Sequence, residues 1–469
     1  MSAALKPQPA TTPLPTGELL AIVREYLETL RFDAADRLLG HILADDGGHP
    51  DALHLSGFVA FKRGRTEQAA ALMERALAAG AAAPRQLCNL AEVYRMLGRI
   101  DAGLALVRRA AALSPTDAVC HFNAAMLHYE AQDTGSCIRA ARRAIALKPD
   151  MPEAHMRLGQ ALLLKGQYAE GWAEYEWRYQ IGGAQPLMPP AFVARGVRPQ
   201  WDGAVLADGQ RLLLVADQGF GDVLMFARYL PWAMARTREI VVACSSELVG
   251  LLARNFPGPT YQSRWDDVGE YAAYCPFSGL PRLAGTQVAD VQGGPSYVRA
   301  DPVRSVAMGE WLGASPDLRV GIGWAGRPAH NNDRNRTVPI SILTPLAAVP
   351  GVTFVSLQKG SAASEAARWP GHAPLIDAQA RIETFEDTAA LLEHLDLVIA
   401  VDTSLVHLAG AMGRPAWVLM PFAPDWRWLA GRMDTPWYDS VTLYRQADAG
   451  DWEPVVERMA EDLAGRAAR

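Results

Sequence analysis

The sequence has few cysteines and no long hydrophobic run. Its 469 residues include five cysteines, scattered along the chain without a CxxC pair. An odd number of isolated cysteines argues against a disulfide framework or a zinc ribbon and favours a reducing cytoplasm. No run approaches the ~18 apolar residues that a membrane span requires. We therefore predict a cytoplasmic protein without a membrane span.

The N-terminus lacks the apolar segment of a secretory signal. The first 16 residues contain four prolines and one lysine, so we predict a disordered arm over residues 1–15. An excess of positive charge is also missing, since the formal net charge is -6. This excludes general electrostatic capture of nucleic acid. The length alone predicts about three domains.

A 34-residue period organises the first third of the chain. Gly64, Gly98 and Gly166 lie on this period, with Gln132 in the remaining position, and prolines on the same period close the segments AALSPTD and AIALKPD. Glycine allows a turn between helices and proline ends the second helix. The pattern resembles the tetratricopeptide repeat and predicts antiparallel helix pairs, without strands, over residues 16–180.

Most periodic residues of these repeats are expected to be helix-packing positions. Function is expected on the concave face, where side chains of the first helices point. Asn89, Asn123 and Arg157 occupy one such column. Stacked asparagines there can hold the backbone of an acceptor protein, and the alternative is a column that is merely solvated.

The composition changes after the repeats. All 13 tryptophans lie at Trp172 or later, and a Pro/Gly-rich stretch marks a linker over 181–204. Short apolar runs then alternate with helical runs in two series, 205–312 and 313–460, followed by a tail at 461–469. Such alternation predicts parallel sheets with right-handed crossovers. The expected fold class is α plus α/β: a repeat solenoid followed by two Rossmann-like domains that face a cleft.

Ligands of open α/β sheets bind at the carboxyl ends of strands, and the first such end is Asp217-Gln218-Gly219-Phe220-Gly221-Asp222. It is not GxGxxG, so a dinucleotide cofactor fits poorly. Gln218, Gly219 and Gly221 form the predicted acceptor-side loop. Asp222 lies at a helix start, which is expected to keep it ionised. It is either a general base for an acceptor hydroxyl or a helix cap.

The second strand end carries arginines. Trp324 and Arg327 follow one apolar run closely, and Arg334 and Arg336 come within ten residues of Arg327. Arginine forms forked hydrogen bonds with phosphate oxygens, so this loop suits an anionic ligand. The alternative is a solvated charged loop.

The third strand end is Asp402, which directly follows the apolar run LDLVIAV, expected to be a buried strand. Thr403 and Ser404 begin a helix whose free N–H groups attract phosphate. Asp402 can accept hydrogen bonds from sugar hydroxyls. His407 lies one helical turn inward, which favours a structural role over that of a base.

Together these segments resemble bacterial glycosyltransferases of family 9, typified by lipopolysaccharide heptosyltransferases. QGFGD is similar to the G-x-G-D loop of that family, and DTSLVHLAGAMGRP to its donor-binding D-T-x-x-x-H-L segment. The resemblance implies a GT-B fold and an inverting reaction from a nucleotide sugar, which is a substrate, without metal or cofactor. It also implies Asp222 as the base and Arg336 as the basic residue at the donor phosphate.

From about residue 16 to residue 460 the chain resembles bacterial proteins that fuse tetratricopeptide repeats to such a transferase. NDRNR, VSLQKG and PFAPDWRW are further shared segments, and Asp217 stands where a Glu is usual. Some members of this group are associated with flagellin glycosylation, so the resemblance implies a protein acceptor recruited by the repeats.

The resulting hypothesis is an inverting, metal-independent transferase that glycosylates a protein hydroxyl, with flagellin Ser or Thr as the case that the resemblance implies. The donor side comprises Trp324, Arg327, Arg336, Asp402, Thr403, Ser404 and His407. No DxD-type pair occupies a strand-end loop, so stabilisation of the leaving group is assigned to Arg336 and the helix dipole. Two alternatives stay open: an acceptor on a lipid-linked or lipopolysaccharide glycan, and a non-catalytic protein-binding scaffold.

Overall fold

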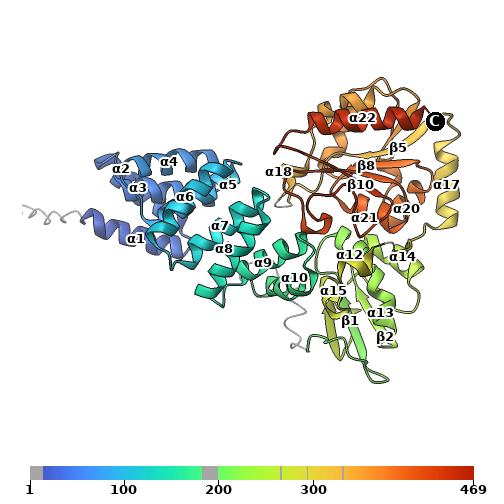
Figure 1. Ribbon diagram of the computed structural model, residues 1–469, viewed down its shortest axis with the longest axis horizontal. Helices are drawn as coiled ribbons and strands as arrows, with labels where there is room; N and C mark the ends of the chain where they lie inside the picture. Colours follow the sequence, from blue (N-terminus) through green and yellow to red (C-terminus); the bar gives the residue numbers. More distant parts are fainter. Residues whose placement is uncertain (1–13, 182–198, 265–266, 293, 330–331, 469) are drawn as a thin grey trace, which may run out of the picture. The chain divides into compact units, whose positions relative to one another are not determined.

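The computed structural model describes residues 14–181, 199–264, 267–292, 294–329 and 332–468. Most of the predicted arm (residues 1–13) and most of the predicted linker (residues 182–198) lie outside the described residues. The described chain has the predicted α plus α/β fold class, with helices first and parallel sheets afterwards (Figure 1). It divides into two compact units, Met1–Arg157 and Leu158–Arg469. The predicted domain boundaries at residues 180 and 312 stay predictions.

The first unit is a series of helices, and its described residues contain no strand. The helix pairs pack in the order that the repeat predicts, α3 on α4, α5 on α6 and α7 on α8. The helices are α1 (Thr16–Glu28), α2 (Phe32–Asp45), α3 (Pro50–Lys62), α4 (Thr66–Ala78), α5 (Pro84–Met96), α6 (Ile100–Leu113), α7 (Ala118–Glu130), α8 (Thr134–Leu147) and the start of α9 (Pro152–Leu164).

The 34-residue period marks the turn inside each helix pair. Positions Leu30, Gly64, Gly98, Gln132 and Gly166 all have positive φ angles, between 57° and 78°. Glycine adopts this conformation without strain, whereas a side chain costs ~1–2 kcal/mol there. The repeat therefore persists where glycine is absent, because the packing of the two helices imposes the turn.

Replacing Gln132 with Gly is expected to stabilise the repeats by about 1 kcal/mol, because the left-handed strain at φ 58° disappears. Denaturant unfolding of the full chain measures this. Ala131→Gly is the matched control, since Ala131 has φ -75°, and there glycine costs ~0.5–1 kcal/mol. Equal destabilisation by both variants would contradict the strain argument.

The second unit begins with the rest of α9, α10 (Tyr168–Tyr175) and the 3-10 segment η1 (Glu176–Gln180). A four-stranded parallel sheet follows in the order β3-β2-β1-β4. Its strands are β1 (Arg211–Val215), β2 (Glu239–Ala243), β3 (Thr260–Gln262) and β4 (Ala273–Pro276). The helices after the strands are α12 (Phe220–Phe226), α13 (Leu230–Met234), α14 (Ser246–Asn255), α15 (Leu280–Leu283), α16 (Val288–Val291) and α17 (Pro302–Leu312).

A six-stranded parallel sheet completes this unit, in the order β10-β9-β8-β5-β6-β7. Its strands are β5 (Leu318–Gly323), β6 (Val352–Ser356), β7 (Leu375–Asp377), β8 (Leu397–Val401), β9 (Ala416–Met420) and β10 (Val441–Arg445). The helices are α18 (Asp333–Arg336), α19 (Thr344–Ala347), α20 (Phe385–Leu392), α21 (Ser404–Ala411) and α22 (Glu453–Ala467). β6 and β8 are buried along their whole length, as their apolar sequences predict.

Each sheet has a switch point where the strand order reverses. The chain leaves β1 toward β2 on one side and returns to β4 on the other, and it leaves β5 toward β6 and returns to β8 in the same way. Ligands of open α/β sheets bind beside such points, at the carboxyl ends of the strands. The loops after β1, β5 and β8 are the three strand ends that the sequence singles out.

An aromatic cluster attaches the last repeat helix to the body of the second unit. The Trp172 ring of α10 meets the Trp426 ring edge-on at 5.2 Å between centroids, and its Nε1–H donates to the Thr286 carbonyl at 3.1 Å. Tyr168 stacks on Trp437 at 6.1 Å. The last repeat helix therefore shares one core with the α/β region. Among the described residues, no helix combines the length and the apolar character that a membrane-spanning segment needs.

Candidate functional site

The loop after β1 presents Asp222 at the first turn of α12. Its Oδ2 accepts the backbone N–H of Gly219 at 3.0 Å, so the side chain caps the start of its own helix. The helix-cap interpretation of Asp222 is thus realised in the geometry. The cap leaves the role of general base open, because the carboxylate has a second oxygen that the cap does not use.

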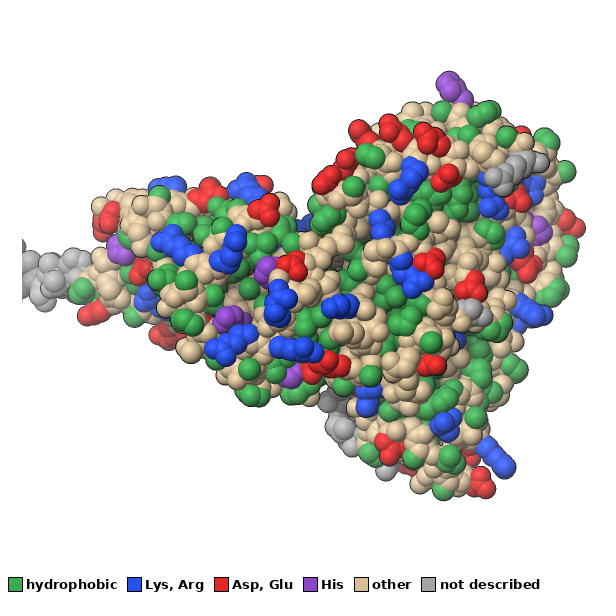
Figure 2. Space-filling model, in the orientation of Figure 1, with side chains coloured by type: hydrophobic (Ala, Val, Ile, Leu, Met, Phe, Trp, Pro, Cys, Tyr) green, Lys and Arg blue, Asp and Glu red, His purple; other side chains and the backbone are tan. Residues whose placement is uncertain are grey.

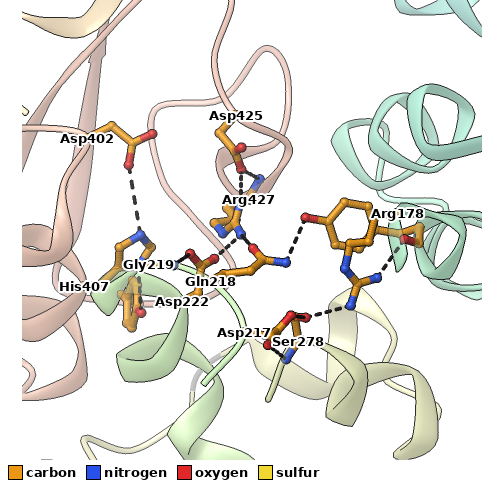
Figure 3. A network of polar contacts seen from close by, with 12 residues as sticks. Arg178, Asp217, Gln218, Gly219, Asp222, Ser278, Asp402, His407, Asp425 and Arg427 are labelled. Carbon is orange, nitrogen blue, oxygen red and sulfur yellow. Dashed lines mark hydrogen bonds and ion pairs between the residues drawn. The ribbon is translucent and has the colours of Figure 1, made fainter. Parts of the chain in front are cut away.

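That other oxygen, Oδ1, pairs with the guanidinium of Arg427 (Figure 3). Arg427 lies in the 3-10 segment η8 (Trp426–Trp428) and comes from 205 residues further along the chain. It also donates to Gln218 Oε1 at 3.1 Å and to Asp425 Oδ1 at 2.5 Å. The sequence assigned no role to Arg427 or Asp425. The signal available was their segment, PFAPDWRW, which belongs to the resemblance.

The ionisation of Asp222 depends on its burial and on neighbouring charges. Burial raises its pKa; the Arg427 guanidinium opposes that rise, while the carboxylates of Asp425 and Asp217 add to it. The sequence predicted that the helix start would keep this group fully ionised. Desolvation acts against the helix start, which spans only one or two turns. That Asp222 is deprotonated at neutral pH stays a prediction.

A buried hydrogen-bond network holds the same loop from the side of the last repeat. Asp217 accepts the backbone N–H of Ser278 and the hydroxyl of Tyr179, both at 3.1 Å. The buried Arg178 donates to Ser278 Oγ at 2.6 Å. Gln218 Nε2 donates to the hydroxyl of Tyr175 at 3.3 Å. The helix end of the repeats thus positions the loop that carries Asp222 (Figure 3).

On the donor side, the structure brings Arg336 to the start of α21. Arg336 Nη1 donates to the carbonyl oxygen of Asp402 at 2.8 Å, and its Nε donates to Asp333 Oδ1 at 3.2 Å. A Cβ at Gly326 would lie 2.4 Å from Arg336 Nη2, so this glycine leaves the space that the guanidinium occupies. The predicted pairing of Arg336 with the helix start is present.

The side chains at the start of α21 differ in their ionisation. Burial and the nearby Asp425 carboxylate raise the pKa of Asp402 to about 6, against the charges of Arg336 and Arg427. Thr403 stands at the N-cap and Ser404 opens the helix, both partly exposed. At neutral pH Asp402 is mostly ionised and can accept hydroxyl protons in hydrogen bonds.

His407 has the structural role that its position predicts. Burial lowers its pKa to about 3, and the charges of Arg427 and Arg228 act in the same direction, so the ring is neutral. Its Nδ1 lies 3.0 Å from the Tyr438 hydroxyl, and the ring stacks on Trp428 at 5.1 Å.

Helices α12 and α21 meet at Gly221. A Cβ at Gly221 would lie 2.6 Å from His407 Cδ2, so only glycine permits this approach. The acceptor-side loop and the donor-side helix, far apart in the sequence, therefore form one site, with Asp222, Arg427, Asp402 and Arg336 around it.

One predicted donor residue, Trp324, lies apart from this site. Trp324 has 0% exposure, and its Nε1–H donates to Glu365 Oε2 at 3.0 Å inside the core of the six-stranded sheet. Its side chain cannot face a donor, and the sequence missed this because a tryptophan after a strand does not reveal its burial. Arg327 is exposed on the same loop.

The predicted protein-binding column lies in the first unit, and its members contact other repeat residues. The Asn89 amide lies 3.1 Å from His54 Nε2, and Asn123 Nδ2 donates to the Cys88 carbonyl at 3.3 Å. The Arg157 guanidinium lies 4.4 Å above the Tyr129 ring. All three side chains of the column stay partly exposed, so binding of a peptide backbone stays a prediction.

The repeats also carry a basic surface. Figure 2 shows Lys and Arg side chains over the repeat helices. Four exposed arginines lie on α6 and α8 at positions that repeat after 34 residues: Arg108, Arg109, Arg142 and Arg143. This surface distinguishes the repeats from the chain as a whole, whose net charge is -6.

A cavity of about 210 Å³ opens beside the loop, at the carboxyl ends of β1 and β2. It is lined by Ala216, Gln218, Phe220, Val223, Cys244, Ser245, Leu248 and Ser263. This lining carries hydroxyl, amide and apolar groups and no ionisable carboxylate or cation. In the described part of the chain, no group of three or more His, Cys, Asp and Glu side chains could hold a metal ion.

Comparison with known proteins connects the two parts of the chain to two families. Residues 56–118 and 122–180 match the tetratricopeptide repeat, and residues 381–419 match glycosyltransferase family 9 (heptosyltransferase). The chain therefore carries segments similar to the tetratricopeptide repeat and a segment similar to glycosyltransferase family 9. The second match contains β8, Asp402 and α21, which carry predicted donor-side residues.

A curated relative matches much of the chain. Protein FlbA of Caulobacter vibrioides is 29% identical over 419 residues, which are 81% of this chain and 66% of FlbA. The chain thus spans just under two thirds of the length of that relative.

Two solved structures each match about a third of the chain. A MamA fragment from Desulfovibrio magneticus RS-1 is 16% identical with a TM-score of 0.32, covering 36% of this chain and 97% of that one. PilF of Pseudomonas aeruginosa is 17% identical with a TM-score of 0.33, covering 37% and 78%. At these scores the likeness carries no conclusion about function.

Proposed function

We propose that this protein is an inverting, metal-independent glycosyltransferase that moves a sugar from a nucleotide sugar to a protein hydroxyl. The contact of Gly221 with His407 supports this above all, because it brings the candidate base loop to the start of α21. A transferase needs a base, a phosphate site and a sugar contact around one point. Asp222, Arg336 and Asp402 are suitable for these three tasks.

In the proposed reaction, the donor phosphates lie at the start of α21 beside Arg336, where N–H groups and a guanidinium favour anions. The acceptor oxygen attacks the anomeric carbon while its proton passes to Asp222. The bond from that carbon to the phosphate oxygen breaks, and the nucleoside diphosphate leaves with the electron pair. Arg336 and the helix start stabilise the departing charge.

The raised pKa of Asp222 suits this role. A general base works best when its pKa lies near the working pH, because it then accepts the proton readily yet remains mostly ionised. Asp222 is active in its ionised form, so the reaction rate should fall as the pH decreases through this pKa.

The acceptor is proposed to be a protein Ser or Thr, with flagellin as the case that the resemblance implies. The cavity beside Gln218 supports an uncharged acceptor, since its lining lacks cations that would bind a phosphorylated glycan. In this proposal the repeats recruit the acceptor protein, and the reaction takes place in the cytoplasm.

Intact-mass analysis of flagellin and other surface proteins from strains with and without this gene tests the acceptor. We expect a protein that loses whole sugar masses in the deletion strain, and restoration by the wild-type gene but not by an Asp222→Asn gene. Unchanged protein masses together with an altered lipopolysaccharide would favour the glycan acceptor. Absence of donor hydrolysis by the purified protein would favour a non-catalytic scaffold.

Removing residues 1–150 is expected to separate acceptor recruitment from chemistry. This truncation keeps α9, α10 and η1, which hold the loop of Asp222 through Tyr175, Arg178 and Tyr179. Transfer to the protein acceptor should fall at least about tenfold, because the tethered acceptor concentration is lost. Donor hydrolysis should stay within about twofold, measured by release of nucleoside diphosphate.

A second truncation, of residues 1–180, provides the comparison. It also removes the side chains that position the loop, so we expect both transfer and hydrolysis to be lost. Equal loss of both activities in the shorter truncation, with circular dichroism showing a folded protein, would mean that the repeats support the structure and do not bind the acceptor.

A further inference from the structure

We propose that Arg427 is a second donor-phosphate residue, which pairs with Asp222 while no donor is bound and moves to the phosphates when the nucleotide sugar arrives. Donor binding would thereby release the base for the acceptor. This inference rests on the proposed function. It concerns a residue to which the sequence motifs assign no role and which lies outside the matched residues 381–419.

Arg427 is held by carboxylates from both sides of the site. It pairs with Asp222 from the loop after β1 and with Asp425 from its own segment, and it also donates to Gln218. Its guanidinium carbon lies 4.4 Å from the centre of the Trp426 ring. The side chain keeps 10% of its surface exposed, so it is buried yet still borders the site.

Asp222 cannot work efficiently as a base in this arrangement. One oxygen accepts the Gly219 N–H and the other pairs with Arg427. An adjacent guanidinium stabilises the ionised carboxylate and so weakens its affinity for a proton. A hydroxyl that approaches Asp222 must compete with the guanidinium for the same oxygen.

The charges around the site favour an exchange of partners. The carboxylates of Asp222, Asp402 and Asp425 surround the guanidiniums of Arg336 and Arg427, while His407 is neutral. In this arrangement the three carboxylates and two guanidiniums sum to a net negative charge, which repels a diphosphate. If Arg427 turns from Asp222 to the phosphates, it forms forked charge-assisted bonds of the kind that arginine makes best.

The exchange also improves the base. Without the guanidinium, the groups that face Asp222 are the carboxylates of Asp425 and Asp217 and the neutral His407, together with its own helix start. Burial and these negative charges then raise its pKa further. The base therefore becomes effective when the donor is present. Because the pKa rises on binding, the protein takes up protons from solution.

This coupling is measurable without turnover. The probes are the nucleoside diphosphates UDP, GDP, CDP and ADP, titrated into the full-length protein by calorimetry at several pH values from about 5 to 8, so that the range in which Asp222 titrates is covered. Repeating each titration in buffers of different ionisation enthalpy counts the protons taken up. We expect the diphosphate that binds to cause uptake of a fraction of a proton.

Four proteins separate the possibilities. In Asp222→Asn, the competing carboxylate is gone while the Gly219 N–H can still be capped, so binding should tighten about fivefold and proton uptake should fall to the share that Asp402 contributes. Arg427→Gln should bind about ten- to a hundredfold more weakly, with uptake reduced to the same share. Arg336→Gln is the matched control, with weaker binding and uptake retained. Unfolding curves identify any variant that fails to fold. If the arginine variants do not fold, the affinity and proton uptake of Asp222→Asn decide whether the partner exchange occurs.

Unchanged diphosphate affinity in Asp222→Asn, or full proton uptake in Arg427→Gln, would overturn the partner exchange and leave the proposed function standing, provided that binding still depends on Arg336. Failure of the wild-type protein to bind any of the four diphosphates would instead overturn the proposed function, and the partner exchange with it.

Discussion

Replacing Asp222 with Asn is expected to reduce sugar transfer by about 10²–10⁴-fold, the usual effect of removing a general base. The amide oxygen of Asn can still accept the Gly219 N–H, so the start of α12 stays capped. Arg427 keeps Asp425 and Gln218 as partners. The loss of stability should therefore stay below the ~3–5 kcal/mol that breaking a buried ion pair costs.

Initial rates of transfer and a thermal melt on the same preparation test this expectation. Asp425→Asn is the matched control, because it also removes a carboxylate from Arg427 while leaving the base in place, and it should retain transfer within about tenfold. A fully active Asp222→Asn enzyme would remove Asp222 from the mechanism. A large loss of stability with a modest loss of rate would mean that Asp222 acts only as a cap.

Replacing Arg336 with Ala is expected to weaken nucleotide-sugar binding by about 1.5–3 kcal/mol, the range for hydrogen bonds to charged groups. This corresponds to roughly 10- to 150-fold in the dissociation constant. The physical reason is that Arg336 lies against the Asp402 carbonyl at the start of α21, where the donor phosphates are proposed to bind. Calorimetric titration with the donor measures the change.

Arg327→Ala is the control for this prediction. Arg327 is exposed on the same loop, so its removal should change donor affinity by less than about twofold. If instead Arg336→Ala binds the donor normally, the phosphate site lies elsewhere. Lys359 is poorly suited to replace it, since its Nζ already donates to the Gln379 and Ile382 carbonyls at 3.1 and 2.6 Å.

Patterns that repeat or alternate along the chain were predictable from the sequence. The 34-residue spacing of Gly64, Gly98 and Gly166 indicates helix pairs, because each unit repeats the same local turn. The alternation of apolar runs with helices indicates the two parallel sheets. Strand ends carry the ligand loops of such sheets, so the loops of Asp222 and Asp402 could be named from sequence, whereas the resemblance to family 9 pointed to Arg336. Arg336 and Asp402 prove to be neighbours.

Burial and long-range pairing were decided by the tertiary structure alone. Trp324 follows a strand just as a ligand contact would, yet it is enclosed in the core. Arg427 reaches Asp222 across 205 residues, and the raised pKa of Asp222 follows from desolvation that no local pattern records. The sequence determined which elements form and where their loops lie, because these depend on neighbouring residues. The folded chain determined the partner and the ionisation of each side chain, because these depend on residues brought together from distant segments.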